Sequence, residues 1–131
     1  MSEGRRERGE RLFREIVGAP PAKGGGDFLD ITIEHLFGEV WARDDLSVRD
    51  RRLVTLTVLI TLGQSGPLAF HMQHALESGD LTPRELNGLV IHLAHYAGWP
   101  LATAGHMAAA AAIGKFETAH PEKRPEPDGT T

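Results

Sequence analysis

Two pairs of histidines, a residue type that binds metals and transfers protons, occur in the stretch LAFHMQHALESGDLTPRELNGLVIHLAHYAGWP, residues 68–100. His71 and His74 are three residues apart, as are His92 and His95. Helical zinc sites more often use histidines four residues apart, and neither pair has a carboxylate at ligand spacing. The spacing therefore favours acid–base chemistry or packing, and we expect no metal ion.

His71 and Glu39 are the candidate proton-transfer groups. The pKa of a histidine lies near working pH, which suits a general acid or base, and a helix N-terminus close to His71 would favour its neutral form. Glu39 lies in FGEVW, after a glycine that could admit a ligand, and an apolar neighbourhood raises the pKa of a carboxyl by desolvation. The alternatives are a histidine packed at a subunit contact, and an ion pair between Glu39 and Arg43, four residues further along.

Four arginines form a positive cluster at positions 43, 49, 51 and 52. A guanidinium binds a carboxylate through two parallel hydrogen bonds, so Arg43 or Arg51 could hold an anionic substrate. The alternative is that these arginines only solvate the end of a helix. Aromatic and imidazole side chains can line a pocket, and the candidates for that role are Trp41, His92 and Tyr96.

The composition excludes several classes of function. The chain has 131 residues, one domain by length, and no cysteine, so disulfides, thiolate metal sites and thiol catalysis are excluded for it. A formal net charge of −4 argues against nucleic-acid binding as the main activity. No apolar run reaches the ~18 residues that span a bilayer, and the N-terminal arginines are not followed by the apolar core of a secretory signal. We therefore expect a cytoplasmic protein without a membrane partner.

The hydrophobic periodicity predicts an all-α protein of about six helices. We expect them at about residues 1–17, 28–42, 48–63, 67–79, 82–97 and 100–116. The apolar stripe expected for the second helix consists of Phe28, Ile31, Leu36, Val40 and Trp41. The third is rich in β-branched side chains, which favours a strand, but it is long and lacks period-two alternation. We therefore expect it to be a helix that is buried on nearly all sides.

Local signals mark where helices begin and how the chain divides. Asp27 can cap the second helix, Ser47 the third, and Thr82 with Glu85 forms a capping box for the fifth. Two prolines and four glycines make 18–26 a flexible connector. We expect an N-terminal helix with this connector at 1–26, a helical domain at 27–118, and a disordered polar tail at 119–131.

Four sequence blocks resemble the carboxymuconolactone decarboxylase family. They are FGEVW, RxRxLVTL, HMQHALESGDLTPREL and HLAHYAGWP, and the resemblance covers residues 28–113. It implies the all-helical fold of the alkylhydroperoxidase D-like proteins and a homo-oligomer, commonly a trimer or hexamer. It also implies a helix for residues 48–63.

The antioxidant branch of that superfamily uses two cysteines three residues apart, with a histidine four residues after the second. Placed on this chain, the histidine falls on His71 and the cysteines fall on Gln64 and Pro67. Because thiolate chemistry requires sulfur, the resemblance does not extend to cysteine-dependent peroxidase activity.

The decarboxylase branch implies loss of carbon dioxide from a small carboxylated lactone, 4-carboxymuconolactone, without a cofactor. His71 and Glu39 would then be catalytic, while Arg43 and Arg51 would bind the substrate. The chain departs from the family pattern at RDDL, residues 43–46, where Arg-Pro-Gly-Leu is usual, and at Pro67, where an acidic residue is often found. These departures concern the substrate, and two alternatives stay open. They are another small carbonyl or cyclic substrate, and a non-catalytic oligomeric binding protein.

Overall fold

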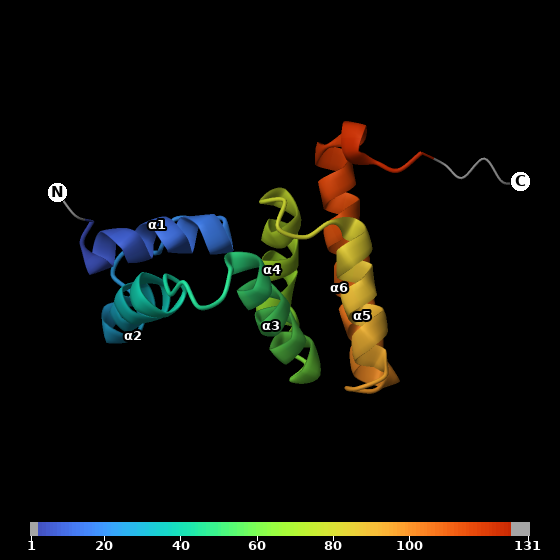
Figure 1. Ribbon diagram of the computed structural model, residues 1–131, viewed down its shortest axis with the longest axis horizontal. Helices are drawn as coiled ribbons and strands as arrows, with labels where there is room; N and C mark the ends of the chain where they lie inside the picture. The colour runs from blue at the N-terminus through green and yellow to red at the C-terminus, as the bar shows by residue number, and fades with distance from the viewer. Residues whose placement is uncertain (1–2, 127–131) are drawn as a thin grey trace, which may run out of the picture.

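The structure is a computed structural model that describes residues 3–126, and it is all-α, which confirms the predicted fold class (Figure 1). Residues 48–63, ambiguous by composition, are helical through Thr61. The elements in chain order are α1 (Arg5–Val17), α2 (Gly26–Ile31), the π-helix η1 (Thr32–Val40), α3 (Val48–Thr61), α4 (Ser65–Glu77), α5 (Pro83–Ala94), α6 (Trp99–Ala119) and the short 3-10 helix η2 (Pro121–Lys123).

The helices are arranged around two hydrophobic cores. In Figure 1, α1 and α2 lie on one side, α3 and α4 in the middle, and α5 and α6 on the other side. The larger core is formed mainly by Leu56, Ile60, Leu68, Met72, Leu76, Leu81, Leu86, Leu93 and Phe116. The smaller core joins α1 to η1 through Leu12, Ile16, Phe37 and Trp41. The stretch between Trp41 and α3 carries the candidate Arg43, whereas Arg51 lies in the first turn of α3.

Two of the three predicted helix starts are confirmed. The Ser47 hydroxyl accepts from the Asp50 amide at 3.0 Å, and Thr82 and Glu85 form the reciprocal capping box. The prediction for Asp27 is wrong, because α2 begins at Gly26 and no side chain caps it. Asp27 instead lies in the first turn, where its charge still suits the helix dipole.

The π-helix changes which apolar residues the second helical segment buries. The predicted stripe is wrong in part, because Phe28 and Ile31 are 83% and 60% exposed, whereas Ile33 and Phe37 are buried. Hydrogen bonding from residue i to i+5 shifts the side-chain phase relative to an α-helix. Close packing accompanies the shift, since a Cβ added to Gly9 of α1 would lie 1.9 Å from the Ile33 carbonyl oxygen.

Helix α3 is not buried on nearly all sides in the single chain, contrary to prediction. Val54 and Val58 are 57% and 47% exposed, and Leu62 follows them on the surface. Because residues four apart lie on the same side of a helix, these three apolar side chains share one exposed side. Over residues 3–126, no helix combines the length and the hydropathy required to cross a membrane.

The C-terminal segment returns to the helical core over part of its length. After α6, the ring of His120 lies 2.8 Å from the Glu77 carboxylate of α4, and Lys123 lies over the Phe116 ring. The tail predicted at 119–131 includes residues 127–131, which lie outside the described residues.

Candidate functional site

Arg43 and Arg51 are brought together by one carboxylate. The Oδ1 of Asp45 accepts from Nη2 of Arg51 at 2.7 Å, and its Oδ2 accepts from Nε of Arg43 at 2.9 Å. The hydrogen bond and charge of Arg43, together with the charge of Arg51, hold the pKa of Asp45 below its usual value. The two arginines predicted to bind an anionic substrate therefore already bind the carboxylate of Asp45.

A small cavity lies beside this bridge. It has a volume of about 180 Å³ and is lined by Val40, Trp41, Leu46, Arg51, Val54 and Thr55. This volume is below the roughly 300–1,000 Å³ of pockets for drug-sized ligands, so the cavity suits a small ring compound. Of the predicted site residues, Trp41 and Arg51 share this cavity.

Arg51 has an unused donor in its buried part. Its side chain is 12% exposed, and its Nε is buried without a hydrogen-bond partner within residues 3–126. A buried donor without an acceptor costs roughly 1–3 kcal/mol, so a ligand oxygen placed there would be stabilised. The other cavity residues are mainly apolar, so the side chain of Arg51 supplies the charged group of the lining.

His71 lies in the second turn of α4 and is partly buried. Burial, and then the charge of nearby Arg52, lower the pKa of His71 to about 4. The lowered pKa favours the neutral imidazole, which is the form that the sequence predicted. Burial is the main cause of the shift, whereas the prediction relied on a helix N-terminus. Within residues 3–126 no hydrogen bond reaches the ring, whose closest aromatic neighbour is Phe70 at 4.8 Å between centroids. Both ring nitrogens can therefore bind water or a ligand.

Arg52 is the buried charge beside His71, whereas the sequence placed it in the arginine cluster without choosing it as a site residue. Its side chain is 2% exposed and donates to the carboxylate of Asp80 at 2.7 Å. It also donates to the carbonyl oxygens of Glu15 and Ile16, at the C-terminal end of α1, at 3.1 Å each. These acceptors hold the guanidinium in place. The available signal was the position of Arg52 four residues before a core leucine, on the buried face of α3.

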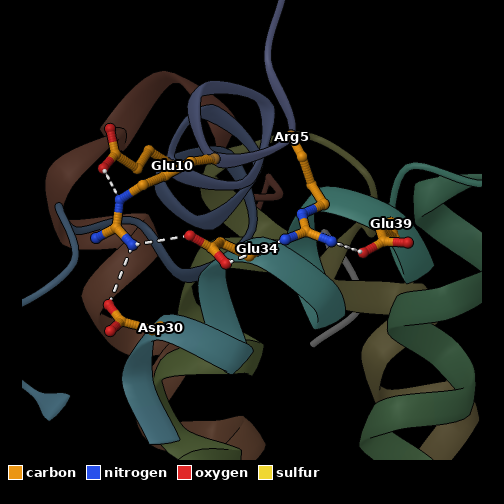
Figure 2. A network of polar contacts seen from close by, with 6 residues as sticks. Arg5, Glu10, Asp30, Glu34 and Glu39 are labelled. Atoms are coloured by element: carbon orange, nitrogen blue, oxygen red, sulfur yellow. Dashed lines mark hydrogen bonds and ion pairs between the residues drawn. The ribbon is translucent and has the colours of Figure 1, made fainter. Parts of the chain in front are cut away.

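Glu39 lies in a charged network, not in the apolar neighbourhood that we expected. Figure 2 shows Arg5 of α1 between Glu34 and Glu39, at 3.3 and 3.1 Å. Residues five apart lie on different sides of an α-helix, whereas the π-helical hydrogen bonding of η1 brings these two glutamates to one side. The predicted ion pair with Arg43 is not formed, because Arg43 binds Asp45.

His92 lies in the last turn of α5, and Tyr96 lies in the turn just after that helix. Their rings stack at 4.9 Å between centroids, and Tyr96 is 79% exposed. Neither residue lines the Arg51 cavity in the single chain. A separate apolar cavity of about 240 Å³ lies between α5 and α6, lined by Val90, Ile91, Ala94, Trp99, Ala102, Thr103 and His106. Across residues 3–126, no cluster of three histidine, aspartate or glutamate side chains is arranged to bind a metal ion.

Residues 26–113 match the model of the carboxymuconolactone decarboxylase family, which is about two-thirds of the chain. The chain belongs to this family. A similar curated protein is the 4-carboxymuconolactone decarboxylase of Acinetobacter baylyi (strain ATCC 33305 / BD413 / ADP1), 39% identical over 83 residues. That alignment covers 63% of this chain and 61% of the relative, so the chain spans about three-fifths of the length of the relative.

All the predicted site residues of this carboxymuconolactone decarboxylase family member lie inside the matched region, whereas α1 lies before it. Helix α1 nevertheless supplies Arg5, which binds Glu39, and the carbonyl oxygens that bind Arg52. The contacts of Glu39, and those of Arg52 beside His71, therefore depend on a helix that lies outside the matched residues.

Proposed function

We propose that this protein is a cofactor-independent carboxy-lyase that acts on a small carboxylated lactone or a related ring compound. The family supports a decarboxylase-type reaction, and the similar Acinetobacter protein is named for 4-carboxymuconolactone. The observation that carries the proposal is Arg51, which lines the apolar cavity beside Trp41 and whose Nε is buried without a hydrogen-bond partner within residues 3–126. This donor is suited to a carbonyl oxygen that gains negative charge.

The reaction requires stabilisation of charge on the ring. When the carbon–carbon bond to the carboxylate breaks, its electron pair moves into the conjugated lactone carbonyl, and carbon dioxide leaves without charge. A proton then adds to a ring carbon. A donor aimed at the carbonyl oxygen, such as Arg51 Nε, binds more strongly as this enolate-like charge develops, which lowers the barrier. An arginine bound to the leaving carboxylate would instead stabilise the substrate more than the transition state.

His71 is assigned to proton transfer in this proposal. A neutral imidazole carries one donor and one acceptor, so it can relay a proton from a water molecule, although His71 does not line the Arg51 cavity in the single chain. Glu39 is the second candidate for this step, and a neighbouring subunit that covers it would supply the desolvation that the single chain lacks.

Homo-oligomer formation is part of the proposal. Val54 lines the Arg51 cavity and, with Val58 and Leu62, forms the exposed apolar side of α3. A second copy packed on this side would bury these residues and close the cavity edge. A trimer or a hexamer is the expected assembly.

Turnover of 4-carboxymuconolactone and of lactones with a single carboxylate tests this function, with carbon dioxide release as the readout. Arg51→Gln should lower kcat/KM by about 10²- to 10³-fold, as does removal of an oxyanion donor. Arg84→Gln is the matched control, since Arg84 is exposed on α5. Absence of turnover by the unmodified protein over the whole panel would contradict the proposal. Full rates in both His71→Ala and Glu39→Gln would contradict the assignment of proton transfer.

A second candidate function is the binding or conversion of another small carbonyl or cyclic compound in the same cavity. The bridge made by Asp45 favours it, because this residue stands in RDDL, where the family pattern has glycine. A panel of uncharged lactones and ketones distinguishes the two candidates. A specific ligand raises the melting temperature, because it binds the native state only.

A further inference from the structure

We propose that Asp45 is a specificity-determining residue whose carboxylate occupies the place between Arg43 and Arg51 that a ligand carboxylate would otherwise take. The inference rests on the function proposed above, since it names the class of compound that the Arg51 cavity accepts. That class is a small ring carbonyl compound without a charged arm beside Arg43 and Arg51. The carboxylate that leaves in the reaction is the only charge that such a substrate needs.

The geometry of the bridge is that of an anion held by two guanidinium groups. Each oxygen of Asp45 accepts from a different arginine, with Nη2 of Arg51 at 2.7 Å and Nε of Arg43 at 2.9 Å. These are the short distances of charge-assisted hydrogen bonds. The next residue, Leu46, and Arg51 both line the cavity, so the bridge lies at its rim.

The donors divide into two sets with different uses. Nη2 of Arg51 donates to Asp45 and to the Arg43 carbonyl oxygen, whereas Nε of Arg51 is buried and has no partner within residues 3–126. We assign this Nε donor to a neutral carbonyl oxygen of the ligand. The ligand does not find a free pair of arginines for a second carboxylate.

The local charge opposes a further anion. Asp44 also lies close enough to interact with the charge of Arg43, so two carboxylates of the loop before α3 lie near the two guanidinium groups. A ligand carboxylate that approaches the rim has to displace Asp45 or remain beside it, and like charges placed together disfavour the wrong ligand. An uncharged arm of the same shape meets no such repulsion.

The experiment compares two unreactive ligands of nearly equal shape, (5-oxotetrahydrofuran-2-yl)acetate and its methyl ester. Their binding is measured by calorimetry on the full chain at fixed ionic strength. The unmodified protein should bind the ester at least as tightly as the acid. Asp45→Asn should increase the affinity for the acid by about tenfold or more and change that for the ester less than about threefold.

Asp44→Asn is the matched control, because it removes the same charge one residue away. Among residues 3–126, no hydrogen bond joins Asp44 to either arginine. An equal gain in acid binding from Asp44→Asn would overturn the inference, since net charge alone would then explain the effect. The inference is also overturned if Asp45→Asn leaves the acid-to-ester ratio unchanged, or if neither ligand binds to any variant. Because this readout requires no turnover, it is independent of the carbon dioxide assay that tests the reaction.

Discussion

The buried guanidinium of Arg52, on α3, donates to the main-chain carbonyl oxygen of Ile16, near the end of α1, across 3.1 Å. Its Nε binds the carboxylate of Asp80, which lies just before α5. One side chain therefore connects three segments that are distant in sequence. The same charge acts on His71, so the connection affects both the stability of the fold and the chemistry of the candidate site.

Replacement of Arg52 by methionine should destabilise the chain by about 3–5 kcal/mol, the usual cost of removing one partner of a buried ion pair. The substitution leaves the carbonyl oxygens of Glu15 and Ile16 without their donor, and Asp80 without its cation. Urea denaturation followed by circular dichroism measures the free energy of unfolding. Arg84→Met, at an exposed position, should change it by less than about 0.5 kcal/mol. Equal effects of the two substitutions would show that Arg52 does not connect the segments.

The low pKa of His71 predicts a loss of stability in acid. The folded chain has a pKa of about 4 at this group, whereas an unfolded histidine titrates near about 6.5. Between these values the unfolded chain binds more protons, so the free energy of unfolding rises with pH. The contribution of His71 is complete above about pH 6.5 and is lost as the pH falls through about 4.

The measurement compares the unmodified chain with His71→Gln, because other acidic groups also titrate in this window. The difference in the free energy of unfolding between the two should shrink as the pH is lowered from 7 to 4.5. Imidazole ¹⁵N chemical shifts should show neutral His71 at pH 6. A midpoint near the ordinary value in the folded protein would contradict the assigned burial.

Because α1 lies close to η1, one methyl group added at their contact should strongly affect the free energy of unfolding. Gly9→Ala would place its Cβ 1.9 Å from the Ile33 carbonyl oxygen, so the two backbones have to separate. We expect a destabilisation of about 1–3 kcal/mol or more. Gly88→Ala is the internal comparison, since Gly88 is within α5 and a Cβ there meets no atom within 4 Å. Alanine there should stabilise by about 0.5–1 kcal/mol. Equal responses to the two substitutions would rule out the close contact.

The exposed side of α3 predicts the effect of introduced charge on assembly. Val58→Asp should dissociate the proposed homo-oligomer, because a carboxylate would be buried without a partner in the interface. Light scattering coupled to size-exclusion chromatography measures the mass of the particle. Thr118→Asp, exposed near the end of α6, should leave the mass unchanged. A monomeric unmodified protein would refute the oligomer itself.

Local chemistry made much of the fold predictable. Ser47 and Thr82 each accept a hydrogen bond from the main-chain amide three residues further along. Because both partners of such a contact are close in sequence, the cap could be predicted from the sequence alone. The phase of η1 was not predictable in the same way, because it accompanies the contact between Gly9 and Ile33, which are distant in sequence. Periodicity analysis assumes 3.6 residues per turn, and a π-helix departs from that assumption.

The residue types of the candidate site could be predicted from the sequence, whereas the contacts between their side chains were harder to predict. Arg51 and Trp41 share a cavity as a substrate-binding pair should, but sequence could not show that Asp45 bridges Arg43 and Arg51. Adjacent arginines at positions 51 and 52 look equivalent in a list of charges. They point to different partners because successive positions on a helix are about 100° apart.

Helix α1 has a consequence for how this protein could be shortened or compared with its relatives. A chain trimmed to residues 26–113 would keep the family match but lose the acceptors of Arg52 and the cation beside Glu39. Arg52 would then lose its two main-chain acceptors, so the position of the charge that acts on His71 would no longer be held by α1. The residues that match the family model and the residues that hold Arg52 therefore have different boundaries.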